Sequence, residues 1–102
     1  MRLKTGVRIL GLRPELVLGL VIADSVYIKH KQDCVVTSVV EGTHSRASIH
    51  YAGGAFDLRT RNISEEILDI LVSDLDAALG DDFDVVKESD HLHCEYQPKQ
   101  SY

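Results

Sequence analysis

Residues 64 to 80 constrain the fold more than any other stretch, because their apolar side chains recur at the spacing of one helix face. Asn62 or Ser64 can cap this helix, acids in its first turn suit the positive end of the helix dipole, and Gly80 suits its end. The sequence therefore predicts an amphipathic helix that packs one side against the core. Its inward stripe consists of Ile67, Leu68, Leu71, Val72, Leu75, Ala78 and Leu79.

A second helix is predicted from Pro14 to about Lys29. Proline suits the first helical turn, where its missing N–H would have no partner. Gly19 lies inside this helix, where glycine costs roughly 1 kcal/mol relative to alanine, so we expect another backbone to pass close to it. The apolar face is broad and mostly buried, and comprises Leu16, Leu20, Ala23 and Tyr27, with Val17, Val21 and Ile28 beside them.

Alternating and β-branched segments predict a sheet beside the two helices. Phe56 and Leu58 fall on one side of their strand and should face the core, which turns Asp57 toward the opposite side. The expected fold class is α+β, a small antiparallel sheet packed against two helices, in one domain that spans residues 1–102. The predicted strands are 34–40, 55–60, 83–88 and 91–97, with an N-terminal arm at 1–12 and a frayed tail at 98–102.

Charge and composition narrow the classes of function. The net charge of −5 argues against a nucleic-acid binder, and the acids crowded into residues 64–90 are interpreted as a solvated helix face. The longest apolar run, residues 16–23, is too short to cross a bilayer, and the N-terminus does not resemble a signal peptide. We therefore expect no membrane insertion and a protein that is cytoplasmic as synthesised. Cys34 and Cys94 are expected to be buried thiols.

Four of the five histidines fall in two short segments that also carry carboxylates. His44 and His50 precede Asp57, and two glycines between His50 and Asp57 let the chain turn sharply. His91 and His93 share one face of the last predicted strand. Two imidazoles and one carboxylate, with a fourth position left to water, are what a catalytic zinc site requires. The sequence thus predicts one bound zinc ion on the open face of the sheet.

The segment Ser48-Ile49-His50-Tyr51-Ala52-Gly53-Gly54-Ala55-Phe56-Asp57 fits the pattern S-x-H-x-x-G-x-A-x-D. In this it resembles the zinc D-alanyl-D-alanine peptidase and hedgehog superfamily. The segment Glu88-Ser89-Asp90-His91-Leu92-His93-Cys94-Glu95-Tyr96 is similar to the second motif of that superfamily, in which an acid precedes the last zinc histidine. The resemblance covers roughly residues 34–97.

The resemblance implies that zinc is bound by His50, Asp57 and His93, with water as the fourth ligand. A second register is open, in which Glu88 and His91 supply the acid-x-x-His pattern and His91 replaces His93. His93 is preferred because the segment that follows it, with an acid and then an aromatic residue, is also familiar in this superfamily. Metal-bound water would become the nucleophile.

The resemblance also implies roles for residues around the metal. A carboxylate would take the proton of the water and pass it to the leaving amine; Asp90 is favoured for this and Glu88 is the alternative. His44 and His91 would flank the metal and donate to the developing oxyanion. Ser48 would orient its loop or support a ligand histidine.

The implied function is a zinc metallopeptidase that hydrolyses stem peptides of peptidoglycan, either as a carboxypeptidase or as an L-alanyl-D-glutamate endopeptidase. Carboxypeptidase members of the superfamily carry an arginine that binds the terminal carboxylate of the substrate. At the corresponding place, residues 38–41, this chain has no arginine. Arg46 or Arg59 could bind the carboxylate instead. The short chain resembles phage or prophage lytic enzymes, which reach the cell wall by release. The alternative is a non-catalytic zinc-binding interaction domain of hedgehog type.

Overall fold

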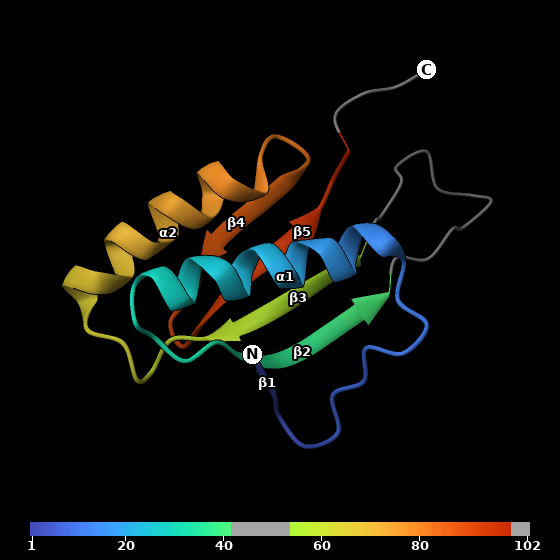
Figure 1. The fold of residues 1–102 in the computed structure, drawn as a ribbon, viewed down its shortest axis with the longest axis horizontal. Coiled ribbons are helices and arrows are strands. Elements are labelled where there is room, and N and C mark those ends of the chain that lie inside the picture. Colours follow the sequence, from blue (N-terminus) through green and yellow to red (C-terminus); the bar gives the residue numbers. More distant parts are fainter. Residues whose placement is uncertain (42–53, 99–102) are drawn as a thin grey trace.

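Two helices pack side by side on one face of a five-stranded sheet in the computed structural model of this chain, which describes residues 1–41 and 54–98 (Figure 1). The prediction of an α+β fold with two helices against a sheet is confirmed. The elements in chain order are β1 (Arg2–Leu3), α1 (Pro14–Lys29), β2 (Val35–Glu41), β3 (Gly54–Arg59), α2 (Glu65–Leu79), β4 (Phe83–Lys87) and β5 (His91–Tyr96).

The sheet is mixed, whereas the sequence analysis expected it to be antiparallel. Its strand order is β1-β2-β3-β5-β4, and β1 pairs with β2 in parallel while the other three pairs are antiparallel. The reason lies in the connection, because α1 carries the chain from the end of β1 back to the start of β2, as parallel neighbours require. Within the N-terminal arm at 1–12, only a two-residue strand forms at this edge.

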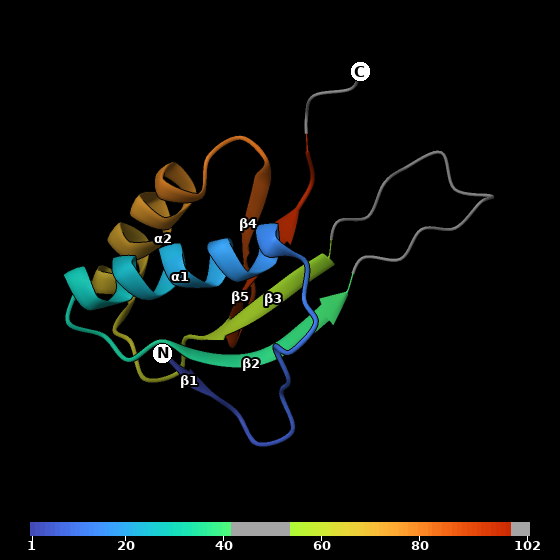
Figure 2. The same cartoon turned by 45° about the vertical axis from the view of Figure 1, so that its right-hand side comes forward.

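The register of the three central strands fixes which side chains are neighbours. Asp57 in β3 lies opposite Ser38 of β2 on one side and opposite His93 of β5 on the other. A bulge between Val36 and Ser38 shifts the register of β2 by one residue at this point. Figure 2, turned relative to Figure 1, shows the helices covering one side of these strands and leaving the other side open.

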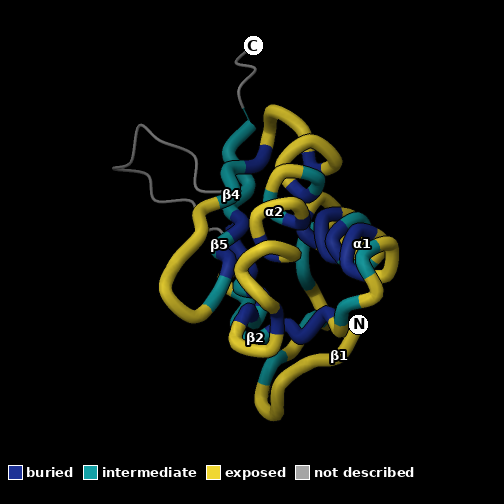
Figure 3. Tube along the Cα trace, turned by 90° about the vertical axis from the view of Figure 1, so that its left-hand side faces the viewer, coloured by how far each residue is buried: buried dark blue, intermediate teal, exposed yellow. Residues whose placement is uncertain are grey.

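The core lies between the sheet and the two helices. Phe56 and Leu58 of β3 and Leu92 and Cys94 of β5 are at most 1% exposed, as the predicted alternation requires. The helices contribute their own buried side chains, and Figure 3 shows the buried segments gathered where the two layers meet. Fully burying one large aliphatic side chain contributes roughly 1.5–3 kcal/mol. The buried apolar side chains of the helices are Leu16, Leu20, Ala23, Val26, Tyr27, Leu68, Leu71, Leu75 and Leu79.

Helix α1 departs from the prediction on its outer side. Val17, Val21 and Ile28 were expected to be mostly buried, yet their exposed fractions are 39%, 52% and 65%. The reason is that one sheet can cover only one side of a helix, and the positions of these residues around the helix point away from the sheet. Leu18, which is 60% exposed, joins them.

The prediction for Gly19 was also wrong in its detail. The neighbours that crowd it are rings and not backbone: a Cβ atom built there would lie 2.8 Å from Cζ of Phe83 and 3.1 Å from Cε2 of Phe56. At the end of α2, Gly80 has a φ of +82°, a conformation that favours glycine and confirms its predicted place. Ser64 is the N-cap residue of α2 without a hydrogen bond from its side chain.

Candidate functional site

The open face of the sheet carries the polar residues of β3 and β5. Because side chains alternate along a strand, burying Phe56 and Leu58 turns Asp57 and Arg59 to the opposite face. The same alternation in β5 buries Leu92 and Cys94 and leaves the three residues that alternate with them half-buried on the open face. These are His91, His93 and Glu95.

Asp57 and His93 are in direct contact at the centre of this face. Nδ1 of His93 lies 2.8 Å from Oδ1 of Asp57, and its Nε2 lies 3.3 Å from Oε1 of Glu95. Both side chains are partly shielded, with 24% of Asp57 and 34% of His93 exposed. Each nitrogen of the His93 ring thus faces a carboxylate oxygen, which fixes the plane of the ring.

His91 extends this arrangement toward the turn between β4 and β5. Its Nδ1 lies 2.6 Å from Oδ1 of Asp90, and its Nε2 lies 3.9 Å from Oδ2 of Asp57. Carboxylates and imidazoles therefore alternate along the open face. We call this set the acid–histidine row: Asp90, His91, Asp57, His93 and Glu95.

The contacts in this row change the proton affinities of its members. The hydrogen bond that Nδ1 of His91 donates to Asp90 raises the pKa of His91 above its ordinary value. Burial lowers the pKa of His93, but hydrogen bonds with Asp57 and Glu95 outweigh it, so the pKa of His93 is also raised. The pKa of Asp90 is lowered by its hydrogen bond with His91. The pKa of Glu95 is lowered by hydrogen bonds from Gln97 and then His93.

A pocket of about 280 Å³ opens beside the row. Asp57, Asp90 and His91 form one part of its wall, and cationic side chains from β3 and from the residues just after β1 and β3 form another. This volume lies just below the range of roughly 300–1,000 Å³ that holds small molecules in proteins. The remaining lining residues are Lys4, Thr37, Arg59 and Arg61.

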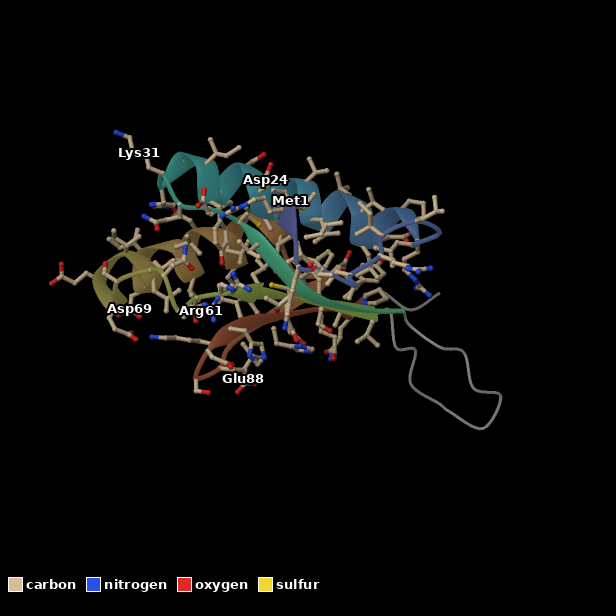
Figure 4. The ribbon with its side chains drawn as sticks, turned by 90° about the horizontal axis from the view of Figure 1, so that it is seen from below. Met1, Asp24, Lys31, Arg61, Asp69 and Glu88 are labelled. Atoms are coloured by element: carbon tan, nitrogen blue, oxygen red, sulfur yellow. The ribbon has the colours of Figure 1, made fainter. Side chains whose placement is uncertain are left out.

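Several residues that the sequence singled out lie outside the described part of the chain. They are His44, Arg46, Ser48 and His50. Glu88 is described and exposed, and its backbone N–H donates to the carbonyl of His91. Figure 4 views the layers with the helices above the sheet and labels Glu88 near the turn between β4 and β5. In contrast to Asp90, Glu88 does not line the pocket.

Lys4 and Arg61 were missed by sequence reasoning. No local pattern could have found Lys4, because its place near Asp57 depends on the pairing of β1 with β2. This pairing brings the backbone N–H of Lys4 to the carbonyl of Val36. Arg61 could have been found by extending the alternation from Asp57 through Arg59. Arg59, predicted to be a weak substrate contact, lies on the open face and lines the pocket.

The donors in the row are of the types that bind zinc. Two ligands of a tetrahedral zinc with bonds of about 2.0–2.1 Å are about 3.3 Å apart, whereas Nδ1 of His93 lies 2.8 Å from Oδ1 of Asp57, the distance of a hydrogen bond. Within residues 1–41 and 54–98, no cluster of three or more histidine, cysteine or acidic residues has an arrangement that could hold a metal ion. Asp57 and His93, two of the predicted ligands, thus lie side by side, and the third predicted ligand, His50, lies outside the described residues.

Comparison of the chain with protein-family models, curated proteins and solved structures finds no match. In the described part of the chain, neither helix has the length and apolar character that a membrane span needs. Cys34 and Cys94 are both buried free thiols, as expected.

Proposed function

We propose that this chain is a zinc-dependent peptidase acting on stem peptides of peptidoglycan, with Asp57 and His93 as two of its ligands. The observation that carries the proposal is the 2.8 Å contact between these side chains on adjacent strands. A carboxylate and an imidazole are held together on an open face, beside a second histidine. The motif at residues 48–57 supplies the third proposed ligand, His50.

Zinc held by these groups would activate water for attack on a peptide carbonyl at neutral pH. Binding requires a free lone pair on Nδ1 of His93, so the proton that this nitrogen shares with Asp57 has to leave. Glu95, on the other side of the ring, keeps Nε2 protonated and holds the ring in place. Glu95 is thus a positioning residue in this proposal.

His91 is suited to donate a proton or a hydrogen bond beside the proposed metal. Asp90 holds a proton on Nδ1 of this ring, and Nε2 points toward Asp57 at 3.9 Å. His93 contacts Asp57 more closely than His91 does, which supports His93 as the ligand. In this arrangement the protonated His91 stabilises negative charge that develops on the carbonyl oxygen.

Asp90 is the better placed of the two proposed general bases. It shares the pocket wall with Asp57, whereas Glu88 lies outside the pocket. The hydrogen bond with His91 lowers the pKa of Asp90, which makes it a weaker base, so its place in the pocket and not its basicity supports this role. Arg59 and the neighbouring Arg61 and Lys4 give the pocket cations that can pair with a carboxylate of the peptide.

Digestion of purified peptidoglycan with the zinc-loaded protein tests the proposal. We expect stem-peptide fragments or free amino acids by mass spectrometry, and a loss of at least about a hundredfold in rate for Asp57→Asn and His93→Gln. The control is Val86→Ala, which changes an exposed residue opposite His93 on β4. If the zinc-loaded wild type cleaves no muropeptide of any common chemotype, the proposed peptidase activity is excluded.

A non-catalytic zinc-binding interaction domain is the second candidate. The observation that favours it is the small volume of the pocket, which would give a peptide little enclosure. Asp90→Asn and Glu88→Gln distinguish the candidates when each is made alone. Loss of hydrolysis with zinc retained identifies an enzyme, whereas zinc binding without turnover in the wild type identifies a binding domain.

A further inference from the structure

The outer side of α1 is apolar along its whole length. The side chains opposite the core form what we call the outer stripe, and it contains no charged residue. Within it, Ser25 donates its hydroxyl to the carbonyl of Val21 at 3.1 Å, so the donor of this polar side chain is already satisfied. The outer stripe consists of Pro14, Val17, Leu18, Val21, Ser25 and Ile28.

Exposure of this stripe needs a physical explanation. Val17, Leu18, Val21 and Ile28 are 39–65% exposed, and the opposite side of the same helix is buried in the core. A helix that is apolar on two opposite sides is normally covered on both of them. The exposed side of α2 differs, because acids such as Glu66, Asp69 and Asp76 lie on it.

The spacing of the stripe is that of a helix that packs against another helix. Leu18, Val21, Ser25 and Ile28 follow one another at intervals of three, four and three residues, the pattern of a coiled-coil seam. In an antiparallel pairing of two copies centred near residue 23, Leu18 of one copy lies opposite Ile28 of the other. Val21 then lies opposite the small Ser25.

Charges beside the stripe agree with this pairing. Glu15, Ile22 and Lys29 follow one another at intervals of seven residues along one flank, acidic at the start of the helix and basic at its end. Two antiparallel copies bring Glu15 of each close to Lys29 of the other. Within the described residues Glu15 has no hydrogen bond or ion pair, and Lys29 has only an exposed contact of 3.4 Å with Asp74.

A groove between the two helices continues the apolar surface beyond the stripe. It has a volume of about 540 Å³, and its lining is mostly apolar but includes the charged pair Lys29 and Asp74. The other lining residues are Val21, Ile22, Ser25, Val26, Ala77 and Ala78. The 16 residues of α1 span about 24 Å, too little for one helix to bury the roughly 800 Å² per partner of a standard interface. A partner helix that also contacts this groove would bury more area than the stripe alone.

We propose that the outer stripe and the adjoining groove form the interface of a homodimer in which two copies of α1 pack antiparallel. In Figure 4 the outer side of α1 faces away from the sheet, with Lys31 labelled just beyond its end. The interface is therefore on the opposite side of the protein from the acid–histidine row. Each copy keeps its open face accessible, and the dimer does not depend on metal.

Sedimentation velocity of the metal-free protein across roughly two decades of concentration tests the dimer. We expect the mass to rise from monomer to dimer, and Val21→Glu to remain a monomer throughout. Val86→Glu is the matched control, because it places the same charge at a residue that is 45% exposed on the open face. A wild-type monomer at every concentration, or a dimer that persists in Val21→Glu with native circular dichroism, would overturn the proposal.

Charge exchange tests the antiparallel order. Glu15→Lys and Lys29→Glu should each weaken the dimer at least about threefold, and the double variant Glu15→Lys with Lys29→Glu should restore the dissociation constant, because opposite charges meet again. A parallel pair would place Glu15 of the two copies at the same end. In that case Glu15→Lys would leave the dissociation constant unchanged, and the antiparallel arrangement would be wrong.

Discussion

Cζ of Phe83 lies 2.8 Å from the position that a Cβ atom would take on Gly19, so the ring of β4 occupies the space that any larger residue of α1 would need. Phe83 also contacts Tyr96, with ring centroids 5.2 Å apart. The absence of a side chain at Gly19 therefore permits α1 to approach the sheet. This explains a glycine inside a helix, where it would otherwise be unfavourable.

Gly19→Ala should lower the free energy of unfolding by about 1 kcal/mol. Overpacking costs about 1–3 kcal/mol and outweighs the gain of about 1 kcal/mol in helix propensity. Chemical denaturation of Gly19→Ala, Phe83→Leu and the double variant measures the coupling, and the smaller side chain should relieve most of the alanine's cost. A Gly19→Ala protein more stable than wild type would show that the ring moves freely.

Leu92→Ala should destabilise the protein by about 2–5 kcal/mol, because Leu92 is fully buried in β5 and its loss leaves a cavity between sheet and helices. Val86→Ala, on the exposed side of the neighbouring strand, should change stability by less than about 0.5 kcal/mol. Urea denaturation of both variants provides the comparison. Equal effects would contradict the assignment of the two faces.

Asp74 contributes to stability in a way that depends on pH. Its carboxylate lies 2.6 Å from Nε2 of His30, and this contact and Lys29 lower the pKa of Asp74 below 3.8. A carboxyl group whose pKa is lowered in the folded state stabilises the fold at pH values above its ordinary pKa. This contribution is lost as the pH falls through the pKa of the folded state. Asp74→Asn should therefore lower the melting temperature at pH 6, and the difference should shrink below about pH 4.

The matched control for this change is Asp76→Asn, on the same helix and exposed. It should leave the melting temperature unchanged at both pH values. A difference between wild type and Asp74→Asn that stays constant from pH 6 to the acid limit would show that the ion pair does not cause it.

Both thiols should be unreactive in the folded protein. Burial raises the pKa of Cys34 to about 12 and that of Cys94 to about 12, so that little thiolate forms at pH 8 and reagents have no access. A thiol-reactive chromophore should label neither cysteine in buffer and both in denaturant. Rapid labelling of the native protein would contradict the position of these strands in the core.

Local patterns predicted much of the fold. The alternation of Phe56, Asp57 and Leu58 placed one carboxylate on the open face, and the stripe of α2 placed its helix within a residue or two of its bounds. The parallel pairing of β1 could not be predicted, because it depends on where α1 packs. The exposure of Val21 was missed for a related reason: periodicity shows that a helix is apolar but not how many of its sides are covered.

The candidate site was predictable to the extent that its residues share a strand. His91, His93 and Glu95 alternate within β5, so their common face followed from spacing alone. The contact between Asp57 and His93 depends on the pairing of β3 with β5, which the sequence does not specify. Lys4 directly follows the edge strand β1, which is far away in the chain, and its place in the pocket required the complete sheet order.

The zinc content of the native protein tests the central claim most directly. Elemental analysis after dialysis against a trace of zinc should find one zinc ion per chain in the wild type and in Val86→Ala. Asp57→Ala and His93→Ala should each lose at least about nine-tenths of it, because three protein ligands are needed to hold the ion tightly. A wild-type protein without stoichiometric zinc, or variants that retain it, would contradict the account.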